Sequence, residues 1–93
     1  MSGAERPGGA EVTVRYWAAL RAAAGTASDR VPAGSLAEVL AAAGARHADG
    51  PRFAQVLRIC SVLVDELPVT QDPAGVDVPA DSVVDLLPPF AGG

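Results

Sequence analysis

The residues with the clearest chemical potential lie in the stretch LLPPFAGG, residues 86–93. The candidate tail consists of Pro88, Pro89, Phe90, Ala91, Gly92 and Gly93. Paired prolines hold the backbone extended, because each ring fixes φ and restricts the residue before it. Glycine has no Cβ and can therefore enter a channel too narrow for side chains, while Phe90 is an apolar anchor before the tip. The pattern predicts a C-terminal carboxylate that is presented to the active site of another protein.

A free carboxylate at Gly93 is a poor acyl donor, so it would need activation before a sulfur or nitrogen nucleophile could attack it. Adenylation with ATP is one such activation. Under this hypothesis the chain is a substrate, a second protein supplies the catalysis, and ATP is used by that activating enzyme while no cofactor binds here. The alternative is a tail that does no chemistry, since chain ends are commonly disordered.

Composition excludes several other classes of function. The chain has 93 residues, enough for one domain, and its 49% hydrophobic and 19% charged residues argue against intrinsic disorder. The net charge is −4, every basic residue is an arginine and no basic stripe is present, so we expect no nucleic-acid partner. No apolar run approaches the roughly 18 residues of a membrane span, so we expect no membrane partner.

The side chains outside the tail show no sign of an internal active site. Cys60 is the single cysteine, which excludes an intramolecular disulfide and favours a reducing, cytoplasmic setting. Its apolar neighbours predict a core position, and His47 is expected to cap a helix. Asp65 and Glu66 are expected to form a turn, and the scattered carboxylates predict no metal site.

Two strands are predicted in the first third of the chain. Residues 11–17 alternate apolar and polar side chains, the pattern of a half-buried strand. The side chains expected to face the core are Val12, Val14 and Tyr16. An alanine-rich stretch is expected to turn the chain toward a second strand at residues 28–32, which would complete a hairpin.

The middle of the chain predicts helices. Ser35 and Glu38 have the spacing of a capping box, which predicts the main helix over residues 35–47. A shorter helix is predicted over residues 51–58, because Pro51 occupies a favourable first position.

Two further strands are predicted after the helices. Residues 59–65 are apolar and β-branched, which favours a buried central strand. Residues 82–87 form the last predicted strand. Its alternation places Val84 and Leu86 inward and Val83, Asp85 and Leu87 outward.

The order strand, strand, helix, strand, strand predicts an α+β domain with a mixed sheet of four to five strands packed on one main helix. If the first and last strands pair in parallel, this is the ubiquitin-like β-grasp arrangement. The expected organisation is a flexible leader over residues 1–10, the β-grasp domain over residues 11–87, and an extended tail over residues 88–93 with a flexible Gly-Gly end.

Four segments together resemble a known family: VTVRYWAALR, SLAEVLAAA, SVLVD and LLPPFAGG. They are similar to the small subunit of molybdopterin synthase, the MoaD-like sulfur carriers of the ubiquitin-like MoaD/ThiS family. The resemblance covers about residues 11–93, and the tail is its most specific part. The sequence PADS before the last strand departs from the acidic-Gly-Asp turn common in the family, which leaves the conformation of that turn open.

The resemblance implies a non-catalytic carrier. Gly93 would be adenylated and converted to a thiocarboxylate by an adenylating and sulfurtransferase enzyme, and the large synthase subunit would use the sulfur to form the molybdopterin dithiolene. It also implies that the tail inserts into the large subunit and that two small subunits flank a large-subunit dimer in a heterotetramer. Trp17 matches a common aromatic position at the partner interface, and Leu63 and Leu87 are further candidates there.

Three alternatives stay open at this point. The chain resembles sulfur carriers for thiamine or cysteine biosynthesis in its diglycine, although paired proline favours the molybdopterin branch. It could also be a ubiquitin-like modifier conjugated through Gly93 to lysines on other proteins. The third alternative is a binding module whose tail is chemically inert.

Overall fold

The computed structural model describes residues 10–89. They form a mixed sheet of five strands with the order β3-β2-β8-β5-β6 and a separate two-stranded pair, β4 with β7. The strands are β2 (Glu11–Tyr16), β3 (Ser28–Pro32), β4 (Gly34–Ser35), β5 (Ser61–Val64), β6 (Leu67–Val69), β7 (Asp77–Val78) and β8 (Val83–Leu87). The helices are α1 (Ala18–Ala24), α2 (Leu36–Arg46), α3 (Pro51–Leu57) and the short 3-10 turn η1 (Pro73–Gly75).

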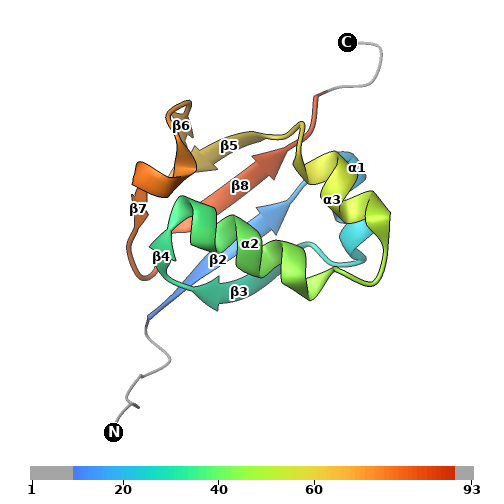
Figure 1. Cartoon of the computed structure of the whole chain (residues 1–93), viewed down its shortest axis with the longest axis horizontal. Coiled ribbons are helices and arrows are strands. Elements are labelled where there is room, and N and C mark those ends of the chain that lie inside the picture. The colour runs from blue at the N-terminus through green and yellow to red at the C-terminus, as the bar shows by residue number, and fades with distance from the viewer. Residues whose placement is uncertain (1–9, 90–93) are drawn as a thin grey trace, which may run out of the picture.

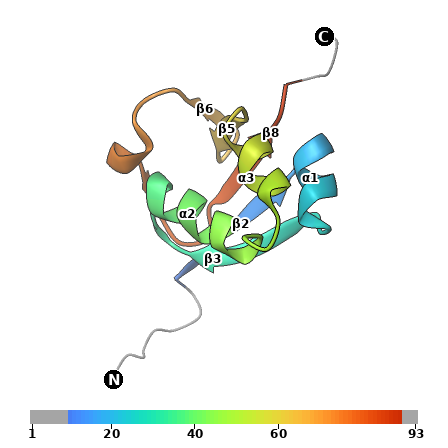
Figure 2. The same ribbon diagram turned by 45° about the vertical axis from the view of Figure 1, so that its right-hand side comes forward.

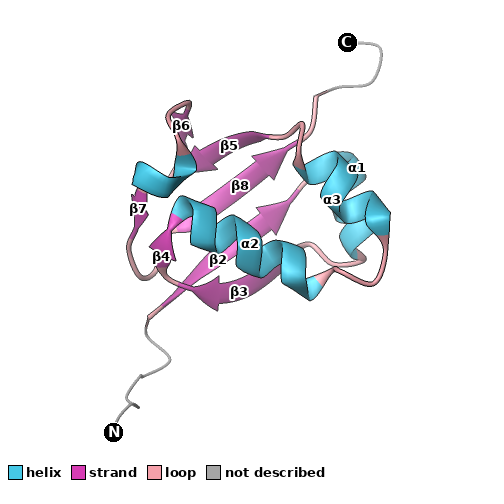
Figure 3. Cartoon of the chain, in the orientation of Figure 1, coloured by secondary structure: helices cyan, strands magenta, loops and turns pink. Residues whose placement is uncertain are grey.

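The sheet is built around a parallel pairing of the first and last long strands, the condition on which the β-grasp interpretation depended. β2 pairs with β8 in parallel, with Tyr16 opposite Leu86, and with β3 in antiparallel. β8 also pairs antiparallel with β5, so it is the central strand (Figure 3). The α+β class and the mixed sheet predicted from the sequence are therefore confirmed.

One face of the sheet is covered by helices and holds the core. α2 crosses this face, and α1 and α3 pack together at the end toward which β2 and β8 run (Figures 1 and 2). The predicted inward side chains Val12, Val14 and Tyr16 are at most 1% exposed, and Val84 and Leu86 are fully buried. The face opposite the helices, called the outer face below, carries the alternate residues of each strand.

The main helix begins where the capping box predicts. The Ser35 side chain accepts a hydrogen bond from the Glu38 backbone N–H, and the Glu38 carboxylate accepts one from the Ser35 backbone N–H. The helix continues through Gly44 to Arg46, with His47 at its C-cap. α3 begins at Pro51, as expected for proline at a first helical position.

Two sequence-based expectations need correction. The alanine-rich stretch after Trp17 is the helix α1 and not merely a turn. β5 begins only at Ser61 and is half-buried beside β8, so residues 59–65 do not form the central strand. Ile59 in particular is 62% exposed, because α3 ends just before it and the chain there is still outside the sheet. A run of apolar residues indicates a strand but not its place in a sheet.

The turn in PADS has a defined conformation. Asp81 adopts a left-handed φ of 70°, which aspartate tolerates better than most residues with a Cβ. Its N–H donates to the carbonyl of Glu11 at 2.8 Å, and the Ser82 N–H donates to that of Pro79 at 3.2 Å. The turn therefore ties the start of β8 to the start of β2.

Candidate functional site

The base of the candidate tail emerges from the middle of the sheet. β8 is hydrogen-bonded to β2 on one side and to β5 on the other, so both neighbours hold the direction in which the chain leaves the sheet. Pro88 is half-buried and Pro89 is exposed. The remaining predicted tail residues, Phe90, Ala91, Gly92 and Gly93, lie outside the described residues.

Trp17 stands beside this exit. It is the residue after β2 and the N-cap of α1, and its carbonyl accepts hydrogen bonds from the N–H groups of Leu20 and Arg21. Because β2 and β8 are parallel and Tyr16 is opposite Leu86, both strands end at the same edge of the sheet. Trp17 is 40% exposed, unusual for so large an apolar side chain.

The indole of Trp17 is held on the outer face by a buried carboxylate. Its Nε1–H donates to Asp85 Oδ1 at 2.9 Å. Arg15 donates to the same carboxylate through Nε at 2.6 Å and through Nη2 at 2.9 Å, and its guanidinium carbon lies 5.6 Å from the centre of the indole ring. These three side chains form one interaction unit, called the Arg15–Asp85–Trp17 cluster below.

The cluster keeps Asp85 ionised. Hydrogen bonding from Arg15 is the main cause that lowers the pKa of Asp85; the Trp17 N–H and the Arg15 charge act in the same direction, and burial opposes them. The sequence alternation placed Asp85 outward, yet the residue is only 4% exposed, because Arg15 and Trp17 cover it. Sequence reasoning missed the cluster; its one available signal was an arginine and an aspartate at outward positions of two paired strands.

The other two predicted interface residues lie near the cluster. Leu63 is opposite Asp85 across the β5–β8 pair, and Leu87 is opposite Ser61. Both leucines are half-buried. The structure thus brings Trp17, Leu63 and Leu87 to one end of the outer face, around the point where the tail begins.

Comparison with known proteins supports the same architecture. The chain is similar to small archaeal modifier protein 1 from Haloferax volcanii, with a TM-score of 0.74, 21% identity and coverage of 89% of this chain and 99% of that one. It is also similar to a putative molybdopterin converting factor subunit 1 from Pyrococcus furiosus, with a TM-score of 0.68, 21% identity and coverage of 86% and 98%. A complex of molybdopterin-converting factor subunits 1 and 2 from Helicobacter pylori matches with a TM-score of 0.63, 19% identity and coverage of 89% and 99%.

The domain has the ubiquitin-like β-grasp fold. The neighbours are small archaeal modifiers and MoaD-like molybdopterin-converting-factor subunits, and the latter are the kind of protein that the sequence resembles. No protein-family model and no curated protein sequence matches the chain.

The β-grasp domain has a shallow hollow on its outer face beside the cluster. It measures about 270 Å³ and is lined by Arg15, Asp65, Glu66 and Val83. Asp65 and Glu66 form the predicted turn, both with positive φ, and Asp65 Oδ1 accepts a hydrogen bond from the Val83 N–H at 2.9 Å.

Within residues 10–89 no group of three or more His, Cys, Asp or Glu side chains is placed to hold a metal ion.

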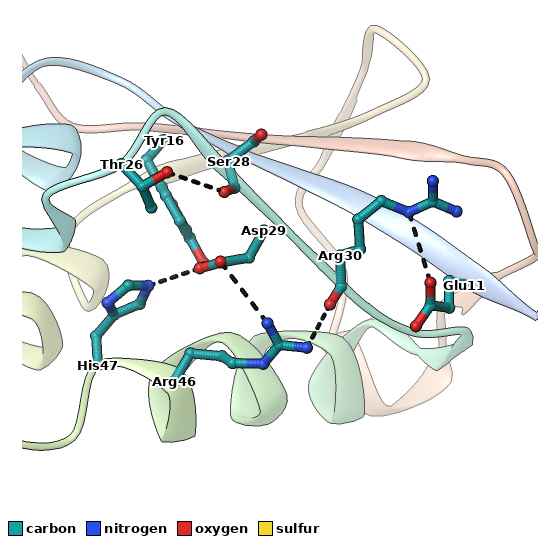
Figure 4. Close-up of polar contacts among 8 residues, drawn as sticks. All are labelled: Glu11, Tyr16, Thr26, Ser28, Asp29, Arg30, Arg46 and His47. Carbon is teal, nitrogen blue, oxygen red and sulfur yellow. Dashed lines mark hydrogen bonds and ion pairs between the residues drawn. The ribbon is translucent and has the colours of Figure 1, made fainter. Parts of the chain in front are cut away.

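A second polar network of the β-grasp domain lies on the helical side (Figure 4). The Tyr16 hydroxyl donates to Asp29 Oδ2 at 2.8 Å, and His47 Nε2 lies 2.6 Å from the same oxygen. The His47 ring stacks on Phe53 with centroids 4.6 Å apart. His47 ends α2, as expected, and the network joins that helix end to β2, β3 and α3.

Cys60 is half-buried, and its thiol donates to the Val56 carbonyl at 3.3 Å. Burial raises the pKa of this thiol to about 11. A thiol with so high a pKa is a poor nucleophile at neutral pH, which agrees with the predicted packing role.

None of the helices within residues 10–89 is long and apolar enough to cross a membrane.

Proposed function

We propose that the protein is a sulfur carrier, the small subunit of a molybdopterin synthase. The observation that supports this proposal is the position of β8: the central strand of a β-grasp domain leads directly into Pro88 and Pro89 and then into the diglycine sequence. The Pyrococcus furiosus and Helicobacter pylori proteins with the same fold are subunits 1 of molybdopterin-converting factors. This geometry suits a folded domain that presents its C-terminal residues as a substrate.

The proposed chemistry takes place at Gly93. Its carboxylate attacks the α-phosphate of ATP in the activating enzyme, which releases pyrophosphate and forms an acyl adenylate. Sulfide then attacks the acyl carbon and displaces AMP, which leaves a thiocarboxylate. In the large subunit this sulfur is transferred to the pterin precursor, where it becomes part of the dithiolene, and hydrolysis of the carrier's C–S bond returns Gly93 to a carboxylate. The chain acts as a co-substrate, and the large subunit supplies the catalysis.

The proposed partners are the activating enzyme and the large synthase subunit. The chain and the large subunit would form a heterotetramer, and the proposed location is the cytoplasm. The Helicobacter pylori structure is a complex of subunits 1 and 2, which supports a large-subunit partner. We propose that Trp17, Leu63 and Leu87 contact that subunit, because they surround the point where the tail leaves the domain.

An intact mass spectrum tests the proposal. The protein is incubated with ATP, the adenylating enzyme and a sulfide source. We expect a mass gain equal to the replacement of one oxygen by sulfur, localised to Gly93, and no gain in a variant that lacks Gly93. An unchanged mass, with the same enzyme active on another carrier, would contradict the proposal.

A ubiquitin-like modifier is the second candidate, favoured by the likeness to small archaeal modifier protein 1. It predicts higher-mass protein adducts in cells that disappear when Gly93 is deleted. Complementation of strains that each lack one sulfur carrier distinguishes the molybdopterin pathway from thiamine and cysteine biosynthesis.

A further inference from the structure

The outer face of the sheet contains a charge that needs an explanation. Asp85 is 4% exposed on the outer face of the sheet. The helices of residues 10–89 do not cover that face (Figures 1 and 2). A buried carboxylate destabilises a protein unless it is paired and hydrogen-bonded. Arg15 and Trp17 supply both requirements: Oδ1 accepts from Arg15 Nε and Trp17 Nε1, and Oδ2 accepts from Arg15 Nη2.

These contacts restrain the indole of Trp17 in two ways. Its N–H is directed to the carboxylate, and the Arg15 guanidinium lies 5.6 Å from the ring centre, within the range of a cation–π interaction. Trp17 is nevertheless 40% exposed, so part of its surface is open to a binding partner. An exposed aromatic side chain that is already immobile loses less entropy when a partner covers it.

The position of the indole connects it with the tail. Arg15 is opposite Asp85 and Tyr16 opposite Leu86 in the parallel pair, so the next residue, Trp17, stands at the edge where β8 ends. A protein that receives the tail must approach this edge.

We propose that Arg15 and Asp85 are positioning residues that hold the Trp17 indole as a preformed anchor for the protein that receives the tail. This inference rests on the proposed function, in which that protein is the large synthase subunit. Because Arg15 neutralises Asp85, the anchor also brings no unpaired buried carboxylate into the interface.

The first experiment needs no partner. Trp17 is the single tryptophan of the chain, so time-resolved fluorescence anisotropy of the full-length protein reports the motion of this indole alone. In the variant Asp85→Ala we expect the amplitude of the sub-nanosecond component to rise at least about twofold, because the N–H contact is lost. Arg15 is 44% exposed and can be solvated, so the variant should fold; circular dichroism checks this.

Two further variants complete this experiment. Glu66→Gln removes a negative charge from the hollow beside the cluster without touching the indole contact, and should leave the anisotropy unchanged. Asp85→Asn keeps the size of the side chain but loses the ion pair, and should give an intermediate amplitude. An indole as immobile in Asp85→Ala as in the wild type would overturn the proposal.

The second experiment is a double-mutant cycle on binding to the large synthase subunit from the same organism, measured by calorimetry. Asp85→Ala should weaken binding about 3- to 10-fold. This factor corresponds to the free-energy cost of immobilising one side chain on binding, which the wild-type indole does not incur. In a Trp17→Ala background the same change should have no further effect, because a positioning residue acts only through Trp17. If Asp85→Ala weakens binding by the same factor in the wild-type and in the Trp17→Ala background, the proposal is overturned. If the wild-type chain binds no large subunit, the proposed function fails, and the anisotropy result alone decides the positioning role.

Discussion

The Tyr16 hydroxyl gives a prediction whose size and pH dependence both follow from the structure. In Tyr16→Phe the ring keeps its edge contacts with His47 and Phe53, at centroid distances of 5.4 and 5.3 Å, and only the hydrogen bond to Asp29 is lost. A hydrogen bond to a charged group contributes roughly 1.5–3 kcal/mol. Asp29 keeps its contact with His47. We therefore expect Tyr16→Phe to lower the free energy of unfolding by an amount near the lower end of this range, about 1.5 kcal/mol at pH 7.

The loss should shrink in acid. Burial alone would raise the pKa of Asp29, but hydrogen bonds with His47 and Tyr16 outweigh it and lower the pKa. A lowered folded-state pKa contributes stability that is present above the unfolded pKa, about 3.9, and is lost as the pH falls through the folded value. Without the Tyr16 hydroxyl, the pKa of Asp29 lies closer to the unfolded value. The two proteins should therefore converge in stability as the pH falls below about 4.

Urea unfolding at pH 7 and at pH 3 measures both effects. With an m-value of about 1 kcal/mol/M for a domain of this size, the midpoint should fall by about 1.5 M at pH 7 and by less at pH 3. The control is Thr26→Ala, which removes an exposed hydroxyl that donates to the Ser28 carbonyl at 3.3 Å. It should cost less than about 0.5 kcal/mol at either pH. An equal loss for Tyr16→Phe at both pH values would refute the assignment to the ionised carboxylate.

Three further predictions concern the rest of the domain. Leu86→Ala should lower the free energy of unfolding by about 3 kcal/mol, because Leu86 is fully buried in the central strand. Leu67→Ala, at a position 69% exposed, should change it by less than about 0.5 kcal/mol, and similar losses in urea unfolding would contradict the assigned core. Cys60 should react with iodoacetamide at pH 7 at least about tenfold more slowly in the folded than in the urea-unfolded chain, because burial raises its pKa to about 11; equal rates would contradict this. Ala18→Gly should raise the free energy of unfolding by about 1 kcal/mol by relieving a φ of 49°, whereas Ala19→Gly, next in the same helix, should lower it by about 0.5–1 kcal/mol. A loss of stability in Ala18→Gly would argue against backbone strain at this position.

Local signals in the sequence determined the elements whose patterns are strong. The alternation in residues 11–17 predicted β2 and its inward side chains, because a strand places successive residues on opposite faces. Ser35 and Glu38 marked the start of α2, because their reciprocal hydrogen bonds form within one turn. The diglycine tail was also visible as sequence alone, and it carries the proposed function.

Short elements that depend on partners were not predictable in the same way. α1 has an alanine-rich sequence with Leu20 as its single buried residue, so it shows little apolar periodicity. β4 and β7 contain two residues each and exist as a pair only because the chain brings them together. The apolar run containing β5 was recognised as a strand, but its place beside β8 follows from the hydrogen bonding of other segments.

The sequence by itself determined that this chain forms an α+β domain, because alternation and capping act over a few residues, and it predicts the Pro-Pro and Gly-Gly tail. Only the tertiary structure decided that Asp85 is buried and that Trp17 is held beside the tail. Arg15 and Asp85 are 70 positions apart, and the parallel register of β2 and β8 brings their side chains within hydrogen-bonding distance. That register depends on burying the opposite face of both strands against the helices, which is a property of the whole fold.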